Sequence, residues 1–388
     1  MSKNVLMIAY TNYSTDARVV KEAEAAVKNG YGVDFIALRR NGDKAAENIN
    51  GVNVIRVNQY RYRGAQKLKY ITTYLEFYFR VLFKSSLLHL KKKYKIVHVN
   101  NMPDFIVLST LFLKLTGAKI ILDIHDPMPN LYISKMEKGK KFFHKMLVWQ
   151  ELISAKFANR VITTTDPMAD ALAKDGIPRN KITVVANFPD ENLFSVNNEY
   201  SINGQLKLIY HGTIAERWGL QKIVLALSRV KNKEKFFFRI IGEGDYSDEL
   251  KKLIKDNNLQ TTVCFDNKSY PFAEIGEHIK DYNLGIASLD LNAHTDYALS
   301  TKMVEYFATG IPVLTIKSRV VNHYFGESGC FFYDSSNIDS IIDIFNRLSE
   351  NTSVLLNKRN EVMHLRERFI WLNEKKKYLK LLNELGDN

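Results

Sequence analysis

The sequence predicts an α/β protein of two domains, each built on a doubly wound parallel sheet. Apolar runs of strand length alternate with segments of helical length along the whole chain, which is typical of parallel sheets covered by helices on both faces. The 388 residues are enough for two domains that each bury a core of their own. A composition of 46% hydrophobic and 25% charged residues fits a globular protein and excludes disordered and fibrous classes.

The first half opens on a predicted buried strand followed by a helix. In the stretch STDARVVKEAEAAVKNG, Ser14 is placed to cap this helix and Gly30 to end it. Val20, Ala23 and Val27 fall on one face, which we expect to be buried. The strands predicted in this half are 4–10, 32–37, 52–57, 96–99, 119–124, 160–164 and 182–185.

A change of composition separates the two halves. Residues 187–207, NFPDENLFSVNNEYSINGQLK, cluster Pro, Asn, Ser and Gly without an apolar period. The strands predicted beyond this linker are 206–210, 236–241, 263–265, 284–287, 313–316 and 330–333. Ligands of such sheets bind beyond the carboxyl ends of the strands, so we expect the functional site there, in a cleft between the halves.

Charge is distributed unevenly along the chain. Residues 1–200 carry 30 Lys and Arg against 18 Asp and Glu, a net +12, whereas residues 201–388 carry 25 against 24. A field of this sign attracts nucleic acid, an anionic membrane surface or a phosphorylated substrate. Two cysteines give neither a disulfide framework nor a metal pattern, which fits a reducing compartment. The N-terminus reads as a strand rather than a signal peptide, and the longest uncharged apolar run, 105–113, is too short to span a bilayer.

Glycines follow two predicted strands of the second half. Gly212 comes just after the predicted strand LKLIY, in the stretch HGTIAERWGL, where it permits a close approach of backbone to a ligand, and Arg217 is near enough to clamp a phosphate. Gly242 and Gly244 follow FFFRII, which suits close approach to a nucleobase. Each motif alone is equally well explained as an ordinary loop or a turn that needs glycine. The GxGxxG fingerprint of dinucleotide-binding proteins is absent.

The stretch YALSTKMVEYFATGIPVL predicts a short helix over 300–308 that is ended by Gly310. Its first turn, Ser300 to Lys302, offers unpaired amides to phosphate oxygens. Glu305, expected with Lys302 on the exposed half of the helix, is suited to accept hydrogen bonds from two ribose hydroxyls. The alternative is a solvated Glu on an amphipathic helix.

These motifs together resemble the retaining glycosyltransferases of family 4. The resemblance rests on HGTIAERWGL, IGEGDYSDELKKL, ALSTKMVEYFATGIPVL and RERFIWLNEKKKYLKLLNEL in the second half. In the first half it rests on DARVVKEAEAAVKNGYGVDFIAL, HVNNMPD, ILDIHDPMPNLY and KITVVANFPDENLF. It implies the GT-B fold, with two Rossmann-like domains over 1–195 and 196–367 around an interdomain cleft. It also implies that a last helix, 368–388, packs back on the first domain.

The resemblance assigns the donor site to the second domain. It implies that Glu305 binds ribose and that Gly212 belongs to the phosphate loop. Arg217 and Lys302 would balance the diphosphate and act as catalytic groups. The remaining donor-binding residues that it implies are Thr213, Gly242, Glu243, Ser300 and Thr301.

Two positions depart from the family pattern. The first Glu of the family's Glu-x7-Glu motif is replaced by Tyr297, with Asp296 beside it, which puts the contact to the sugar hydroxyls in doubt. The Arg that often follows the loop glycine is replaced by Thr213, which leaves Arg217 and Lys302 to hold the diphosphate.

Residues of the first domain are expected on the acceptor side. By resemblance, His125 touches the donor sugar or shapes the acceptor site and is counted as catalytic; the alternative is a His that satisfies a neighbouring backbone group. Asp126 is placed beside it. Asp16 and Arg18 border the acceptor site, or alternatively serve as a helix cap and a surface ion pair.

The resemblance implies an enzyme of the hexosyltransferase type, which moves a sugar from a nucleoside-diphosphate-sugar to a hydroxyl with retained anomeric configuration. The donor is a UDP-sugar by preference, with a GDP-sugar possible, and the acceptor is a glycan or a lipid-linked precursor of surface polysaccharide. Retention is explained by front-face attack, with the diphosphate taking the acceptor proton. No obligatory cofactor or metal is expected, because no His/Asp cluster has ligand spacing and fixed cations can replace a metal.

The segment 60–95 is basic and aromatic, with ten Lys or Arg and one acid, Glu76. This composition is typical of a surface that lies on anionic lipid, although a core-packing helix with a basic outer face also explains the aromatic residues. We therefore expect a cytoplasmic enzyme that is peripheral on the inner face of the cytoplasmic membrane.

Three alternatives stay open from the sequence. A non-hydrolysing NDP-sugar epimerase shares the fold but needs acid/base pairs around the sugar, and acids are few near His125. A nucleic-acid-binding protein fits the charge, yet no reader motif is present and nucleic acid is not expected as a partner. The third is a protein that binds glycans or membranes without catalysis.

Overall fold

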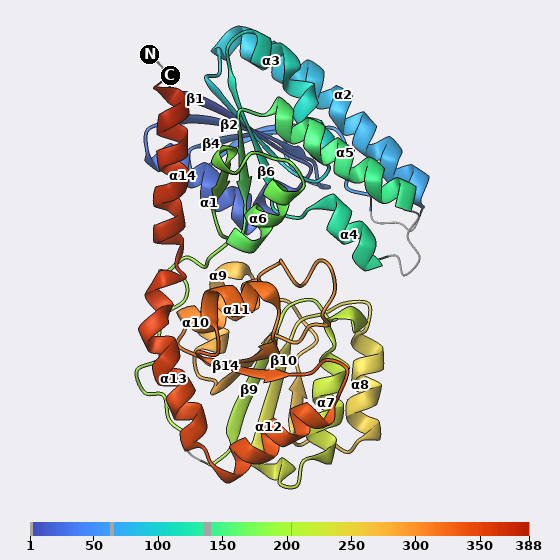
Figure 1. Cartoon of the computed structure of the whole chain (residues 1–388), viewed down its shortest axis with the longest axis vertical. Helices are drawn as coiled ribbons and strands as arrows, with labels where there is room; N and C mark the ends of the chain where they lie inside the picture. The colour runs from blue at the N-terminus through green and yellow to red at the C-terminus, as the bar shows by residue number, and fades with distance from the viewer. Residues whose placement is uncertain (1–2, 63–65, 136–140, 203, 388) are drawn as a thin grey trace. The chain divides into compact units, whose positions relative to one another are not determined.

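The computed structural model describes residues 3–62, 66–135, 141–202 and 204–387. Contacts divide the chain into two compact units. The N-terminal unit comprises Met1–Ala186 together with Glu374–Asn388, and the C-terminal unit comprises Asn187–Asn373. Both are three-layer α/β units with a central sheet, as the sequence predicts (Figure 1).

The sheet of the N-terminal unit has the strand order β3-β4-β2-β1-β5-β6-β7-β8 and is parallel except for the β3–β4 pair. The point where the order reverses lies between β1 and β5, each of which is almost wholly buried because helices cover both faces. The strands are β1 Asn4–Ala9, β2 Gly32–Leu38, β3 Ala46–Ile49, β4 Val52–Val57, β5 Ile96–Asn100, β6 Lys119–Ile124, β7 Arg160–Thr163 and β8 Ile182–Val184.

The antiparallel edge strand β3 was not predicted from the sequence. It pairs with β4 through a two-residue turn, with Ile49 opposite Val52. Asn50 and Gly51 form the turn with φ of 51° and 87°, the left-handed conformation that a two-residue hairpin requires at both positions. The Asn-Gly pair is therefore the sequence signal that identifies this hairpin.

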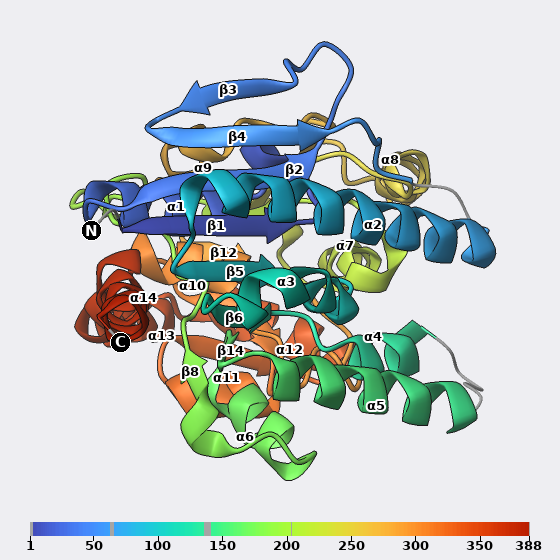
Figure 2. The same cartoon turned by 90° about the horizontal axis from the view of Figure 1, so that it is seen from above.

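Helices α2, α3 and α5 lie on one face of this sheet, and α1 and α14 lie on the other (Figures 1 and 2). Helix α1 begins one residue after Asp16, so the prediction that Ser14 caps it is wrong. Ser14 lies in a preceding 3₁₀ turn, where its hydroxyl accepts a hydrogen bond from Arg40. The helices are α1 Ala17–Lys28, α2 Lys67–Lys92, α3 Leu111–Leu115, α4 Met128–Lys135, α5 Lys141–Phe157, α6 Asp166–Lys174 and α14 Trp371–Gly386.

Most of the C-terminal helix α14 belongs to the N-terminal unit. The buried Glu374 carboxylate accepts a hydrogen bond from the amide of Ala186 at 2.8 Å. The Tyr378 hydroxyl lies 3.1 Å from Nδ1 of His98 on β5, and both side chains are fully buried. Because buried polar atoms lose water, these contacts fix the position of the helix on the sheet.

The sheet of the C-terminal unit is entirely parallel, with the order β11-β10-β9-β12-β13-β14. This is the doubly wound order, and its switch point lies between β9 and β12. The strands are β9 Leu206–His211, β10 Phe236–Ile241, β11 Val263–Phe265, β12 Leu284–Ile286, β13 Val313–Ile316 and β14 Cys330–Tyr333.

Helices α7, α8 and α12 cover one face of this sheet, and α9, α10 and α11 cover the other (Figure 1). Large apolar side chains from the strands and from α7 and α12, such as Phe238, Leu227 and Phe345, form its core. The helices are α7 Leu220–Arg229, α8 Ser247–Asp256, α9 Phe272–Ile279, α10 Thr301–Ala308, α11 Arg319–Phe325, α12 Asp339–Glu350 and α13 Ser353–Leu365.

All thirteen strands predicted from apolar runs are present, each within one residue of its predicted bounds at either end. The predictions succeed in both units because the strands are rich in β-branched and aromatic residues and are bounded by Gly and polar residues. Among the described helices, none has both the length and the apolar character that a membrane span requires.

We predict that Tyr378→Phe destabilises the N-terminal unit, because it leaves Nδ1 of the buried His98 without its hydrogen-bond partner. The expected loss is about 1–3 kcal/mol in the free energy of unfolding. Differential scanning calorimetry measures it. Tyr31→Phe is the matched control, because the hydroxyl of Tyr31 bonds Asn383, which is only half-buried and to which water has access. Equal effects of the two substitutions would contradict the assigned role of the His98 contact.

Candidate functional site

Two loops meet backbone to backbone at the carboxyl ends of β9 and β10. The amide of Gly212 donates to the carbonyl of Ile241 at 2.9 Å, and the amide of Ile214 donates to that of Glu243 at 3.1 Å. A Cβ on Gly242 would lie 1.8 Å from the carbonyl oxygen of Gly212. The glycines after β10 are therefore required by loop packing, which confirms the sequence alternative of a turn that needs glycine.

The side chain of Lys302, from the first turn of α10, lies against the loop that follows β9. A Cβ on Gly212 would lie 2.7 Å from Lys302 Cε, so the absence of a side chain there leaves room for the lysine. Its ammonium is 5.1 Å from the ring centroid of Tyr210 and 5.3 Å from that of Trp218, within range of cation–π attraction. Burial lowers the pKa of Lys302 to about 8, against the opposing effect of the Glu305 carboxylate.

Arg217 adds a second cation in the same neighbourhood. It is exposed, lies in the short turn Glu216–Trp218, and its guanidinium is 5.1 Å from the ring centroid of Trp218. Its charge contributes to lowering the pKa of Lys302. Trp218 thus has both cations within range of its ring.

Glu305 is buried, so the prediction that it lies on an exposed half of its helix is wrong. Every residue from Met303 to Ala308 is buried, because α10 is enclosed along this length. The carboxylate of Glu305 lies 3.2 Å from Nε2 of His211, the last residue of β9. The sequence analysis did not select His211, although its place between a buried strand and Gly212 is a signal for it.

The N-terminus of α10 is capped by backbone alone. Ser300 is the N-cap and its side chain makes no capping hydrogen bond. Within the described chain, neither a side chain nor backbone outside the helix accepts from the amides of Thr301 and Lys302. Thr213 and Glu243 are exposed on the two glycine loops.

Asp296 precedes Tyr297, which replaces the first Glu of the family motif. The Asp296 side chain is bound by Arg319 of α11. Its carboxylate accepts from the amide of Arg319 at 2.7 Å and from the Arg319 side chain at 3.3 Å. The same guanidinium lies 5.0 Å from the ring centroid of Tyr297. This arrangement ties the stretch before α10 to α11.

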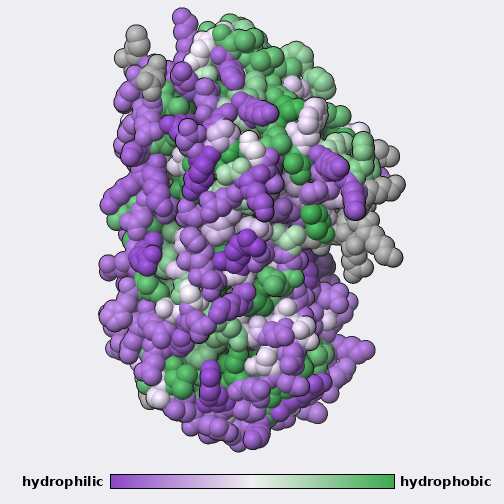
Figure 3. Space-filling view, viewed as in Figure 1, coloured by the Kyte–Doolittle hydropathy of each residue, from purple (hydrophilic) through white to green (hydrophobic). Residues whose placement is uncertain are grey.

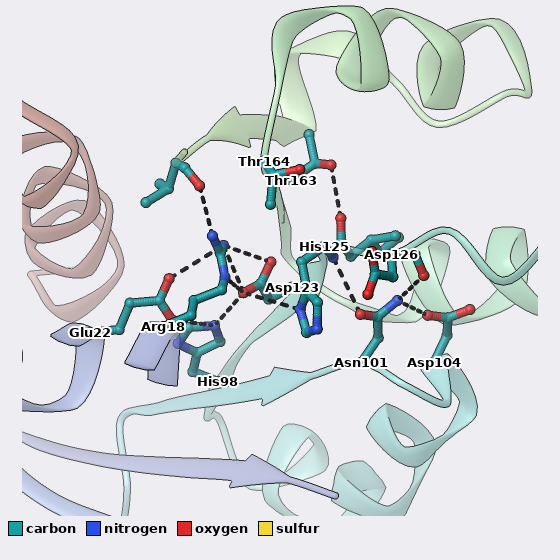
Figure 4. Close-up of polar contacts among 12 residues, drawn as sticks. Arg18, Glu22, His98, Asn101, Asp104, Asp123, His125, Asp126, Thr163 and Thr164 are labelled. Carbon is teal, nitrogen blue, oxygen red and sulfur yellow. Dashed lines mark hydrogen bonds and ion pairs between the residues drawn. The ribbon is translucent and has the colours of Figure 1, made fainter. Parts of the chain in front are cut away.

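The N-terminal unit contains a second cluster, formed by buried charges (Figure 4). Arg18 donates to both carboxylate oxygens of Asp123, at 2.9 and 3.0 Å, and to the carbonyl of Val185 at 3.0 Å. Its side chain is buried, so a surface ion pair is excluded for Arg18. Asp16 is the N-cap residue of α1, where its carbonyl accepts from the amide of Val20, but its side chain makes no capping hydrogen bond.

Glu22, His98 and Asp123 form a buried group of the kind that can hold a metal, a group that their wide separation in the sequence concealed. Burial raises the pKa of Glu22 to about 8 and lowers that of His98 to about 4, so both side chains are neutral at intermediate pH. The guanidinium of Arg18 already lies 2.8 Å from Asp123 and 3.3 Å from Glu22. A metal cation would therefore meet an existing positive charge, and the group does not fit one.

His125 and Asp126 follow β6 beside this cluster (Figure 4). The His125 side chain is 23% exposed, and its Nδ1 lies 3.9 Å from Oδ2 of Asp123. Among the described residues Nδ1 has no hydrogen-bond partner, so this nitrogen does not serve a neighbouring backbone group. The loop is held instead by Asn101, which accepts from the amide of His125 and donates to the carbonyl of Asp126. Asn101 also donates to Asp104, whose pKa burial raises to about 6.

Comparison with family models identifies the two units. The model described as Glycosyltransferase Family 4 matches residues 17–193, and the model described as Glycosyl transferases group 1 matches residues 196–366. The chain belongs to the family-4, group 1 glycosyltransferases. It is a transferase with the two-domain GT-B fold, which confirms the resemblance drawn from the sequence motifs.

Solved glycosyltransferase structures share this fold at low sequence identity. Sucrose-phosphate synthase from Thermosynechococcus elongatus has a TM-score of 0.77 and 14% identity, with coverage of 98% of this chain and 99% of that one. Anabaena HepE, in complex with UDP, has a TM-score of 0.72 and 13% identity, with coverage of 99% and 100%.

One curated relative matches part of this glycosyltransferase. WcaI of Escherichia coli strain K12, provisionally named a colanic acid biosynthesis glycosyl transferase, is 23% identical over 214 residues. The match covers 52% of this chain and 51% of WcaI, so the chain spans about half the length of that relative.

We predict that Gly244→Ala destabilises the C-terminal unit of this glycosyltransferase, because the added Cβ would lie 2.0 Å from the carbonyl oxygen of Ile214. Overpacking of this kind costs about 1–3 kcal/mol. Calorimetry measures the loss. Gly386→Ala is the control, since its nearest contact, at 3.5 Å, is an ordinary one. A Gly244→Ala variant as stable as the control would refute the close approach of the two loops.

We predict that the pH dependence of stability carries a contribution from Glu22. The folded state keeps a proton on Glu22 up to a pKa of about 8, whereas the unfolded chain loses it near 4.5. The free energy of unfolding therefore falls as pH rises through this window. Glu22→Gln removes the titration and gains stability relative to wild type from pH 4.5 to 8, by up to about 1.4 kcal/mol per pH unit.

Thermal unfolding midpoints of the wild type and Glu22→Gln at several pH values between 4.5 and 8.5 measure this difference. The titration of His98 is present in both proteins and cancels to first order. Glu76→Gln is the control, because Glu76 is a surface residue with 45% of its side chain exposed. A wild type and Glu22→Gln pair with parallel pH curves would show that Glu22 is ionised in the folded protein.

Proposed function

We propose that this glycosyltransferase moves a sugar from a nucleoside-diphosphate-sugar to a hydroxyl of a glycan or lipid-linked acceptor, with retention of anomeric configuration. The observation that carries the proposal is the set of cationic and donor groups around Gly212. Lys302, Arg217 and the open amides of α10 surround the carboxyl end of β9, at the switch point of the parallel sheet. This is the position at which doubly wound sheets bind ligands.

These groups are proposed to act by electrostatic stabilisation. Negative charge grows on the diphosphate as the bond to the sugar breaks, so fixed positive charges that lie close to it lower the barrier. Lys302 and Arg217 supply these charges, and no metal is required by the proposal. A diphosphate beside Lys302 favours its charged form and so opposes the effect of burial on its pKa.

The buried Glu305 is proposed to accept the two ribose hydroxyls of the nucleotide. An ionised carboxylate is an acceptor only, which suits a diol, and this carboxylate lies 3.2 Å from Nε2 of His211 at the end of β9. Gly242 and Glu243 on the neighbouring loop are proposed to border the base, and Ser300, Thr301 and Thr213 the phosphates. A UDP-sugar is favoured as donor, since HepE, which has the same fold, is found with UDP and with UDP-glucose.

The N-terminal unit is proposed to recognise the acceptor, with His125, Asp126 and Asp16 as candidate contacts. Arg18 acts there as a positioning residue, since its guanidinium is bound to Asp123 and Val185, and Asp123 lies beside the ring of His125. A role in surface polysaccharide synthesis fits the partial match to WcaI. A lipid-linked acceptor also agrees with the basic aromatic segment 60–95, which is proposed to meet an anionic membrane surface.

The nucleotide preference is tested by thermal shift with UDP, GDP and ADP. A ligand that binds only the folded state raises the midpoint, by an amount that grows with its concentration relative to Kd. We expect the largest rise with UDP. A rise with none of the three nucleotides at millimolar concentration would overturn the proposed donor site.

Substitution of the donor-site charges tests the mechanism. We predict that Arg217→Ala lowers kcat about 10²–10³-fold, because one fixed charge on the leaving diphosphate is lost. Glu305→Gln is expected to weaken nucleotide binding in the thermal-shift assay while preserving the side-chain shape. The matched controls are Arg229→Ala and Glu249→Gln, at exposed positions on α7 and α8. Transfer by Arg217→Ala at the rate of Arg229→Ala would exclude Arg217 from catalysis.

A further inference from the structure

An unpartnered apolar stripe runs along the outer side of α2. Exposed apolar residues recur at intervals of four and then three positions, so they share one face of the helix. Phe83, for example, is 67% exposed, a large fraction for a Phe in a folded unit. The stripe consists of Ile71, Leu75, Phe79, Phe83, Leu87 and Leu90.

The apolar surface continues onto two further helices that the sequence analysis did not single out. On α5, Phe142 and Trp149 are 73% and 65% exposed, with Met146 between them at the same helical spacing. On α3, Leu115 is 77% exposed. Helices α2 and α5 both pack against the 3₁₀ segment Asp104–Thr110, and α3 follows it directly, so the three helices form one layer (Figure 2).

We call the outward surface of α2, α3 and α5 the apolar face. Apolar side chains gather over these helices in the upper part of Figure 3. Extended apolar patches on folded proteins mark a docking surface.

Basic residues border the apolar face. Exposed lysines and arginines lie on the same helices, whereas the acidic residues on these helices are either paired with an arginine or buried. Glu76 pairs with Arg80 at 2.7 Å, and Glu151 is buried. The exposed bases in the described parts of these helices are Lys69, Arg80, Lys84, Lys91, Lys92, Lys141, Lys145 and Lys156.

We infer that the apolar face docks this protein on an anionic lipid bilayer, with Trp149 and the α2 stripe at the headgroup boundary. Aromatic and aliphatic side chains beside Lys and Arg match that boundary in both polarity and charge. A second copy of the chain is a poorer occupant, because a symmetric contact would bring two basic rims together. The inference rests on the proposed function and extends it. It names the docking surface that presents the enzyme to a lipid-linked acceptor.

Vesicle flotation of the full chain tests the docking. We expect the wild type to float with vesicles containing phosphatidylglycerol and to bind vesicles of phosphatidylcholine alone at least tenfold more weakly. Phe83→Ser combined with Trp149→Ser is expected to lower binding to the anionic vesicles at least tenfold. The matched control combines Leu356→Ser and Leu372→Ser, which alter side chains 42% and 41% exposed outside the face, and is expected to bind within twofold of wild type.

The basic rim is tested in the same assay. Lys84→Glu with Lys145→Glu is expected to weaken binding to the anionic vesicles at least tenfold. Lys252→Glu with Lys376→Glu makes the same change of net charge on α8 and α14, at exposed positions outside the face. Equal losses in the two pairs would show attraction by net charge alone and would overturn the assigned surface.

Trp149 also reports the contact directly. Anionic vesicles are expected to shift the tryptophan emission of the wild type to the blue, as an exposed indole enters the lipid boundary. Trp149→Phe keeps an aromatic side chain, so it should still float with vesicles while losing the shift. A shift that persists in Trp149→Phe would place α5 away from the lipid.

Two other outcomes overturn the inference. Failure of the wild type to float with anionic vesicles would do so. A dimer in sedimentation equilibrium that Phe83→Ser with Trp149→Ser dissociates would assign the face to a second copy. Flotation needs no donor or acceptor, so a failure of glycosyl transfer and a failure of docking are distinguished.

Discussion

The constraint on which the C-terminal unit depends is the backbone contact between the loops after β9 and β10. No side chain fits between Gly242 and the carbonyl of Gly212, so the two loops continue the hydrogen bonding of their strands beyond the sheet. Because Gly212 has no side chain, Lys302 from α10 can lie over it. The positions of the candidate phosphate-binding groups thus follow from where glycine occurs after two parallel strands.

The N-terminal unit depends on charge compensation in its interior. Arg18 joins α1 to the end of β6 and to the backbone after β8, and it balances the charge of Asp123. Glu22 and His98 lie beside this pair in neutral form, and Tyr378 connects His98 to the C-terminal helix. Breaking such a buried pair is costly, so the cluster fixes α1 against β6 and the backbone after β8.

The strands could be predicted from the sequence because each is a short run of buried β-branched or aromatic residues, and the glycine loops because they follow those runs. The edge strand β3 was missed although Asn50 and Gly51 signal its turn. The buried group of Arg18, Glu22, His98 and Asp123 could not be predicted, because its residues come from three elements up to about a hundred residues apart. The burial of Glu305 was not predicted, for a related reason. Helical periodicity tells which residues share a face, but the partner His211 is supplied by another strand.

The two units treat their charges in opposite ways, and this contrast bears on function. In the N-terminal unit the buried Arg18 pairs with the carboxylate of Asp123, so its charge is compensated within the protein and no ligand is needed for that. In the C-terminal unit Lys302 is surrounded by aromatic rings and a glycine loop, and Arg217 is exposed beside it. The nearby carboxylate of Glu305 lies beside Nε2 of His211, and within the described chain it makes no ion pair with either cation. An excess of positive charge at the end of a parallel sheet is unfavourable in the free protein and favourable once an anion binds. The cost of holding these cations together without a partner is therefore the physical reason to propose the diphosphate site in this unit.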